Sequence, residues 1–185
     1  MRLFVAINLP SDLRRDIWRA SEPLRREKDV RWVAESGLHL TLRFLGETAP
    51  DAAGSLGEAV NRASSRHAPF RTRLGGLGAF PSMRKPRVVW LGIERSAALE
   101  RLHADVQTAL AAEGLEPDTR AFRPHLTLGR ARRDAPIERI AERVAGASSI
   151  DLDRTAAVEA VDLMRSELGP GGARYSVVRA CPLRG

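Results

Sequence analysis

The stretch that decides the fold is His39-Leu40-Thr41-Leu42-Arg43-Phe44-Leu45-Gly46, because its first tetrapeptide returns as His125-Leu126-Thr127-Leu128. Alternate residues of a β-strand point to the same face. Each copy therefore presents an imidazole and a hydroxyl together, while its two leucines point to the reverse face. The repeat predicts two related halves that bring two histidine–threonine pairs to one site.

Two opposed imidazoles and two hydroxyls suit displacement at phosphorus. Histidine has an unperturbed pKa of about 6.5, so one imidazole can act as base and the other as acid near neutral pH. Thr41 and Thr127 can donate hydrogen bonds to the non-bridging phosphate oxygens. This chemistry needs no metal and no cofactor. Zinc ligation is the rival reading of the histidines, but it takes three or four ligands, and the sequence has no His/Cys cluster with ligand spacing.

The faces on which three residues next to the motifs lie depend on whether the strands stay regular. Arg43 shares the parity of His39 and Thr41, so alternation places it beside them as a candidate phosphate or RNA contact. Phe44 shares the parity of the leucines, which predicts a core residue. Arg130 is also a candidate phosphate ligand, but alternation puts it on the leucine face unless the strand ends or bulges at Gly129.

The rest of the chain alternates between strand and helix signals without a regular βαβ rhythm. This pattern favours an α+β fold with mainly antiparallel sheets. Turns or a loop are predicted at 75–78 and 81–86 from their glycines and prolines. Strands are predicted at 3–9, 30–33, 38–45, 70–74, 87–93, 125–128, 156–165 and 173–183, and helices at 11–27, 50–66, 97–112 and 136–145.

Composition narrows the class of protein. The 185 residues carry a formal charge of +7, which raises the expectation of a polyanionic partner such as RNA. The apolar runs are far shorter than the ~18 residues that cross a bilayer, so we expect no membrane association. The single cysteine, Cys181, cannot form an internal disulfide, which fits the cytoplasm.

The residues 39–46 and Arg123-Pro124-His125-Leu126-Thr127-Leu128-Gly129-Arg130 resemble the paired motifs of the 2H phosphoesterases. Among them the chain is most similar to the LigT-type RNA 2′,3′-cyclic phosphodiesterases, also called 2′-5′ RNA ligases. The segments 2–6, 32–39, 86–92 and 165–175 fit the same pattern, so the resemblance covers nearly the whole chain.

The resemblance implies a fold and an activity. The fold is bilobal and α+β, with two mainly antiparallel sheets related by a pseudo-two-fold axis, flanking helices and a central cleft. Residues 1–185 then form one domain of two intertwined lobes, each contributing one motif, at 39–42 and 125–128. The implied reaction opens a terminal 2′,3′-cyclic phosphate of RNA to a 2′-phosphate.

The resemblance also implies residue roles. His39 would be the proton donor to the leaving 3′ oxygen, His125 the proton acceptor on water, and Thr41 and Thr127 the phosphate ligands. The near-symmetry of the motifs leaves open which imidazole is the acid. Reversible 2′-5′ RNA ligation would exchange the two roles.

The expected partner is RNA with 2′,3′-cyclic phosphate ends, tRNA fragments included, or a related nucleotide, acted on by a monomer. Two alternatives stay open. One is the same chemistry on a small cyclic-phosphate nucleotide. The other is a nucleotide- or RNA-binding module without catalysis, although a binder could dispense with the imidazoles.

Overall fold

The structure is a computed structural model that describes residues 1–147, 149–169 and 172–185, and its strand residues outnumber its helical residues. The strands are β1 (Arg2–Asn8), β2 (Val30–Trp32), β3 (His39–Glu47), β4 (Phe70–Ser82), β5 (Lys85–Ile93), β6 (His125–Ala131), β7 (Arg154–Val158), β8 (Ala160–Gly169) and β9 (Gly172–Pro182). The α-helices are α1 (Ser11–Ala20), α2 (Glu22–Arg25), α3 (Ala52–Ser64), α4 (Ala97–Ala112) and α5 (Ile137–Gly146). A single 3-10 turn, η1 (Glu35–Gly37), leads into β3.

The strands join in one sheet whose two halves meet at the repeated motifs. Its order is β7-β4-β5-β6-β3-β1-β8-β9, with β2 paired to β6, and every pairing is antiparallel. The first-motif group is β3, β1, β8 and β9. The second-motif group is β6, β5, β4, β7 and β2. The α+β class is confirmed, and the two expected sheets are joined by the pairing of β3 with β6.

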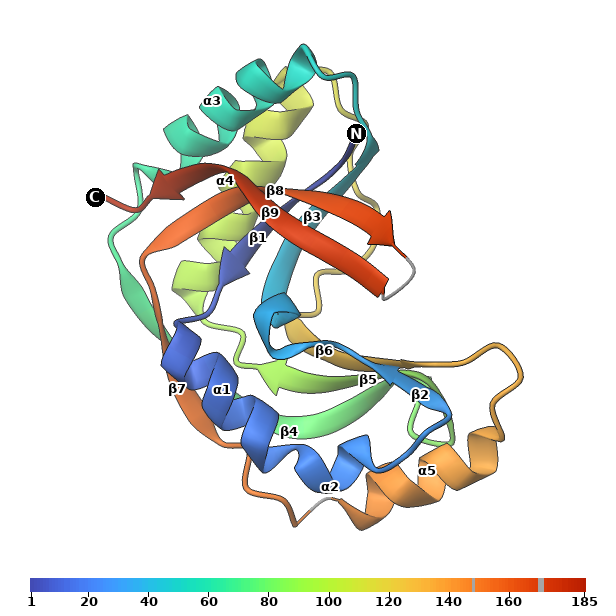
Figure 1. Ribbon diagram of the computed structural model, residues 1–185. Helices are drawn as coiled ribbons and strands as arrows, with labels where there is room; N and C mark the ends of the chain where they lie inside the picture. The colour runs from blue at the N-terminus through green and yellow to red at the C-terminus, as the bar shows by residue number, and fades with distance from the viewer. Residues whose placement is uncertain (148, 170–171) are drawn as a thin grey trace.

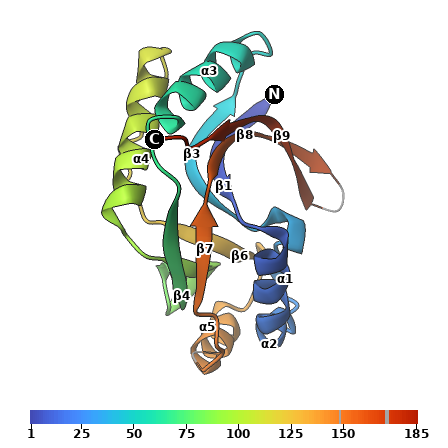
Figure 2. The same cartoon turned by 90° about the vertical axis from the view of Figure 1, so that its left-hand side faces the viewer.

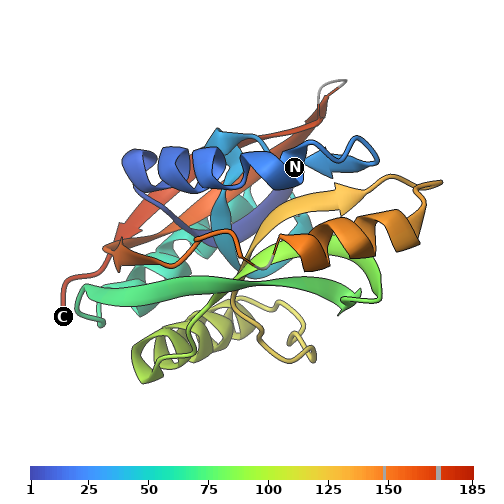
Figure 3. The same cartoon turned by 90° about the horizontal axis from the view of Figure 1, so that it is seen from below.

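Helices cover each group of strands separately. Helices α3 and α4 pack on each other beside the first-motif group, and α3 contacts β8 and β9 (Figure 1). Helix α5 contacts β5 in the second-motif group, where α1 and α2 also lie (Figures 2 and 3). The chain passes repeatedly between the groups, and β1 at its start pairs with β8 near its end.

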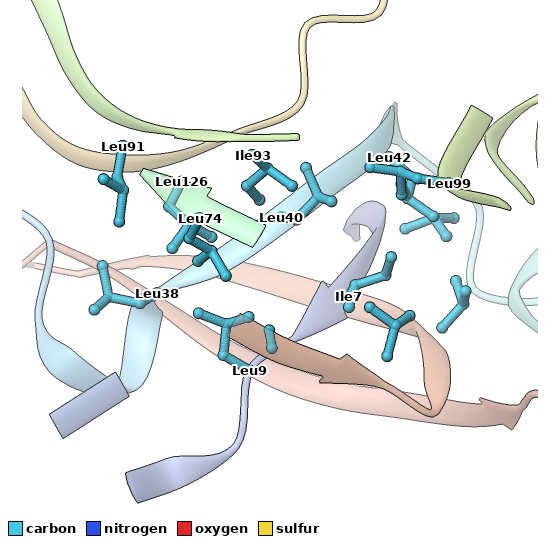
Figure 4. Packing of buried hydrophobic residues seen from close by; sticks show 14 of the residues in the cluster. Ile7, Leu9, Leu38, Leu40, Leu42, Leu74, Leu91, Ile93, Leu99 and Leu126 are labelled. Carbon is cyan, nitrogen blue, oxygen red and sulfur yellow. The ribbon is translucent and has the colours of Figure 1, made fainter. Parts of the chain in front are cut away.

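The leucines of both motifs build one core. Leu40 and Leu126 are at most 2% exposed and lie near Leu74 and Ile93 (Figure 4). Burying a leucine side chain stabilises the fold by roughly 1.5–3 kcal/mol. The apolar side of the tetrapeptide therefore fixes which way its imidazole and hydroxyl point.

Three sequence predictions about elements are wrong, each for a local reason. The helix expected over 11–27 is broken at Ser21, and Pro23 sits in the first turn of α2, where its missing N–H costs nothing. Residues 75–78 lie inside β4 as an irregularity, with Gly76 at φ +74°. The strand expected over 156–165 is divided, since β7 pairs with β4 whereas β8 pairs with β1.

Candidate active site

The two motifs touch at their centres. Strands β3 and β6 pair antiparallel at Leu40 and Leu126. In this register Thr127 lies opposite His39 and His125 lies opposite Thr41, because partners in an antiparallel pair share a face. The two imidazoles and two hydroxyls therefore gather around one bridge, on the side of the sheet away from the leucines. We call this side the motif face.

Both motif strands bulge at the same place. Strand β1 pairs Ala6 with Thr41 and Val5 with Arg43, so the register passes over Leu42. Strand β5 likewise passes over Leu128 in pairing with β6. A bulge reverses the facing of the residues beyond it. The burial of His39–Phe44 and His125–Arg130 accordingly follows one pattern: Leu42 and Leu128 are each followed by a second buried residue and then an exposed one.

The bulge in β3 overturns two placements made from alternation. Arg43 does not lie beside His39 and Thr41: it is only 8% exposed and points to the helix side of the sheet. Its guanidinium donates hydrogen bonds to the Gln107 side chain on α4 and to the backbone carbonyl of Glu116. Arg43 therefore braces the segment between α4 and β6, and it is withdrawn as a phosphate or RNA contact.

Phe44 takes the place expected for Arg43. It is 55% exposed and not buried, and its ring lies 6.1 Å from that of Phe4, which in turn lies 5.0 Å from the imidazole of His39. The prediction of a core residue is wrong because the bulge turns Phe44 out of the leucine row and onto the motif face.

Arg130 lies on the motif face because β6 bulges just before it. The sequence prediction of Arg130 as a phosphate ligand required such a bulge. Gly129 occupies the second buried position, where a Cβ atom would meet Val30 Cγ1 at 2.5 Å and Trp32 at 2.6 Å. The exposed guanidinium of Arg130 lies close enough to His125 that its charge contributes to lowering the pKa of that imidazole. Arg130 thus stands beside the histidine–threonine cluster, available to an anion.

His125 has a fixed orientation. Its Nδ1 lies 2.6 Å from the carbonyl oxygen of Arg123, an acceptor, so Nδ1 carries the proton and Nε2 is left with its lone pair in the neutral ring. Burial is the main cause that lowers the pKa of His125, and the charge of Arg130 adds to it. A neutral imidazole with a free Nε2 is suited to accept a proton.

The imidazole of His39 is surrounded by different groups from that of His125. A hydrogen bond with the backbone of Gly37 orients the ring, and burial lowers its pKa to about 4. Phe4 and Tyr175 each place a ring centroid 5.0 Å from the imidazole. The first-motif group thus gives its histidine an apolar surrounding, and no arginine contributes to the pKa of His39.

Aromatic rings flank both histidines alike. Tyr175 stands edge-on to His39 at 83°, and Phe80 stands edge-on to His125 at 82°, each at 5.0 Å. Trp90 adds a second ring 6.1 Å from His125. Sequence reasoning missed Phe4 and Trp90 as neighbours of the histidines. Strand parity could have indicated Trp90, since it pairs with Thr127.

The other two histidines lie outside this cluster. His67 Nε2 bonds to Asp105 at 3.0 Å, and His103 stacks on Phe122 at 3.8 Å while contacting Gln107. Both have structural partners. Across residues 1–147, 149–169 and 172–185, no group of three or more His, Cys, Asp or Glu side chains could hold a metal ion, and no helix is long and apolar enough to cross a membrane.

A family model described as the 2′-5′ RNA ligase superfamily matches residues 13–170. The chain belongs to this superfamily. A Thermus thermophilus protein named RNA 2′,3′-cyclic phosphodiesterase is 36% identical over 100% of this chain and 91% of the relative. A Geobacillus stearothermophilus protein of the same name is 34% identical over 98% of this chain, which spans only 57% of that relative.

Solved structures agree with the superfamily assignment. The crystal structure of E. coli LigT complexed with 3′-AMP matches 100% of this chain with 98% of its own, at 29% identity and a TM-score of 0.77. The resemblance inferred from the paired motifs is therefore confirmed, and so is the α+β fold that it implied.

Proposed function

We propose that this chain hydrolyses RNA ends that carry a 2′,3′-cyclic phosphate and releases a 2′-phosphomonoester. The observation that carries the proposal is the convergence of two histidines and two threonines around the Leu40–Leu126 bridge. The names of the relatives support the same reaction. Localisation in the cytoplasm and action as a monomer are parts of this proposal.

The mechanism follows from how each histidine is held. His125 Nε2 removes a proton from water as the water oxygen bonds to phosphorus on the side opposite the 3′ oxygen. The bond from phosphorus to the 3′ oxygen breaks, and His39 gives that oxygen its proton. The histidines end with exchanged protonation, which solvent restores. In ligation, a 5′ hydroxyl would take the place of water and give its proton to His125. Cleavage of the resulting 2′-5′ linkage by the 3′ hydroxyl would run these transfers in reverse.

Three groups would hold the phosphate. Thr41 and Thr127 donate hydrogen bonds to its non-bridging oxygens, and Arg130 offers a fork of N–H donors to the same charge. The phosphate also supplies the charge that His39 needs. Burial disfavours the protonated imidazole in the free protein, and a bound anion raises its pKa again. Substrate binding therefore prepares the acid.

The first test uses a short RNA that ends in a 2′,3′-cyclic phosphate, incubated with the protein in EDTA. The expected product co-migrates with the 2′-phosphate standard and is absent with His125→Ala. A 3′-phosphate product would contradict the assigned leaving group. Loss of activity in EDTA that zinc restores would contradict the mechanism.

The dependence of kcat/KM on pH tests the acid–base pair. Because both histidine pKa values lie below their ordinary value of about 6.5, the singly protonated pair is most abundant between two lowered values. We expect a bell-shaped profile with its maximum below about pH 6.5. A maximum on the alkaline side of that value would exclude this pair.

A small cyclic-phosphate nucleotide is the alternative substrate, and the LigT structure with 3′-AMP favours it as a class. Comparing kcat/KM for 2′,3′-cyclic AMP and for the cyclic-ended RNA separates the two. Binding of either without turnover by the unaltered chain would instead identify a binding module.

A further inference from the structure

An arginine-rich groove lies beside the end of the second motif strand, β6. It encloses about 620 Å³ and takes in the start of β2, the end of β6 and the segment that follows. Arg130 belongs to both the groove and the surroundings of His125. The groove therefore adjoins the surroundings of the candidate active site at Arg130.

Cross-strand pairing concentrates positive charge here. Arg31 on β2 is the register partner of Arg130 on β6, so their side chains share a face. Each residue advances a strand by about 3.3 Å, which places Arg130 roughly 10 Å along β6 from Thr127. The charged lining residues are the arginines 31, 130, 132 and 133 and the aspartates 29 and 134.

Four arginines outnumber two aspartates in this lining. Asp29 already accepts a hydrogen bond from Arg139 at 2.7 Å. Within the described part of the chain, the guanidinium groups of Arg31, Arg130 and Arg133 have no hydrogen bond or ion pair. Arg132 is anchored through Nε to the Lys28 carbonyl at 3.0 Å. Several guanidinium donors are thus held open to a ligand.

We propose that this groove binds the phosphodiester backbone of the nucleotides on the 5′ side of the cyclic end. The inference rests on the proposed function, because it takes the cyclic phosphate to lie between the motifs. An RNA that ends in a cyclic phosphate continues from there only toward its 5′ end. Guanidinium groups bind phosphate oxygens through paired hydrogen bonds, and contacts to the backbone carry no sequence information. The groove would favour oligonucleotides over mononucleotides regardless of base.

The test compares substrates that differ only in length. The unaltered protein and the variants Arg31→Gln and Arg133→Gln are assayed on 2′,3′-cyclic AMP and on a tetranucleotide ending in the same group. We expect each variant to lower kcat/KM for the tetranucleotide about tenfold, since a hydrogen bond to a charged group is lost. The mononucleotide contacts neither residue, so its kcat/KM stays within about twofold. Arg101→Gln, on the exposed face of α4, is the matched loss of charge and changes neither rate.

The dependence of affinity on salt concentration gives a second test. Each phosphate neutralised on a single strand contributes about 0.7 to the slope of log affinity against log salt concentration. The slope for the tetranucleotide should therefore exceed that for the mononucleotide, and each groove variant should reduce it. Equal losses on both substrates, or none on either, would overturn the proposal.

Failure of the groove and failure of the proposed function remain distinguishable. If the unaltered protein cleaves neither substrate, the proposed function fails. Fluorescence anisotropy with a labelled tetranucleotide ending in a 2′-phosphate then tests the groove alone. Weaker binding by Arg31→Gln than by Arg101→Gln supports the groove, and equal binding overturns it.

Discussion

The two halves of the candidate active site share a backbone arrangement but differ in the charge next to their histidines. Each places a histidine, a threonine and a bulge in the same order along its strand. Beyond the bulge the first half presents Phe44 and the second presents Arg130. Aromatic rings flank both imidazoles, but only that of His125 also lies close to a cation, Arg130.

This difference shows how a repeated motif can support two unlike roles. The shared part sets where the imidazoles lie. The single residue after the bulge, Phe44 or Arg130, sets the charge around each of them. A nearby cation disfavours an imidazolium, which suits His125 as the base. In the proposed mechanism His39, which lacks that cation, regains a proton once an anionic phosphate is bound.

Removing either imidazole gives the largest expected effect. His39→Ala and His125→Ala should each lower kcat by about 10²-fold or more, because proton transfer loses its positioned group. A cyclic substrate with sulfur in place of the 3′ oxygen distinguishes the two, since a thiolate leaves without a proton. On that substrate His39→Ala should recover most of its activity and His125→Ala none. The opposite recovery would exchange the assigned roles.

The dependence of the free energy of unfolding on pH tests the burial of His39. His39 has a pKa of about 4 in the folded protein and about 6.5 when unfolded, so the unfolded chain binds more protons between these values. The free energy of unfolding should thus fall by about 3 kcal/mol as pH drops from 6.5 to 4. His39→Asn, which does not titrate, should lack this part of the decline in urea unfolding. Parallel curves for the two proteins would show that His39 is not buried as described.

The threonines test whether the shared part of the motif is symmetric in function. Thr41→Val and Thr127→Val each remove one hydroxyl from the motif face while leaving a side chain of the same shape. We expect each to cost about 1.5–3 kcal/mol of transition-state stabilisation, measured from kcat/KM. Thr41→Ser, which restores the donor, is the control and should retain most activity. An unaffected kcat/KM in either valine variant would remove that threonine from the phosphate site.

The smallest expected effects are changes in KM when the residue after each bulge, Arg130 or Phe44, is replaced. Arg130→Leu should raise KM about tenfold, because a charged donor to phosphate is lost. Phe44→Leu, at the equivalent position, keeps an apolar side chain there and should change KM by less than about threefold. Equal effects would mean that the two halves hold the substrate alike.

Much of this site was predictable because alternate residues of a strand share a face. Alternation placed His39 with Thr41 and His125 with Thr127, and the repeat brought both pairs to one location. The class of fold followed from the order of the elements and from the family resemblance.

The bulges were not predictable from alternation alone. Arg43 and Phe44 were placed on the wrong faces because the register passes over Leu42, and this depends on how β1 pairs with β3. No glycine stands at 42 or 43 to indicate it. Gly129 does mark the second bulge, which explains why Arg130 could be placed conditionally. Phe4 escaped notice because its neighbour His39 lies on another strand.

The position of β1 has a consequence for when this protein becomes active. Strand β1 lies between β3, which carries His39, and β8, which includes Ser166. Pairings of such long sequence separation are slow to form, because the intervening chain must first be closed into a loop. On the ribosome, β1 therefore cannot gain its second neighbour in the sheet until β8 has emerged. We expect fragments that stop before β8 to be inert toward RNA.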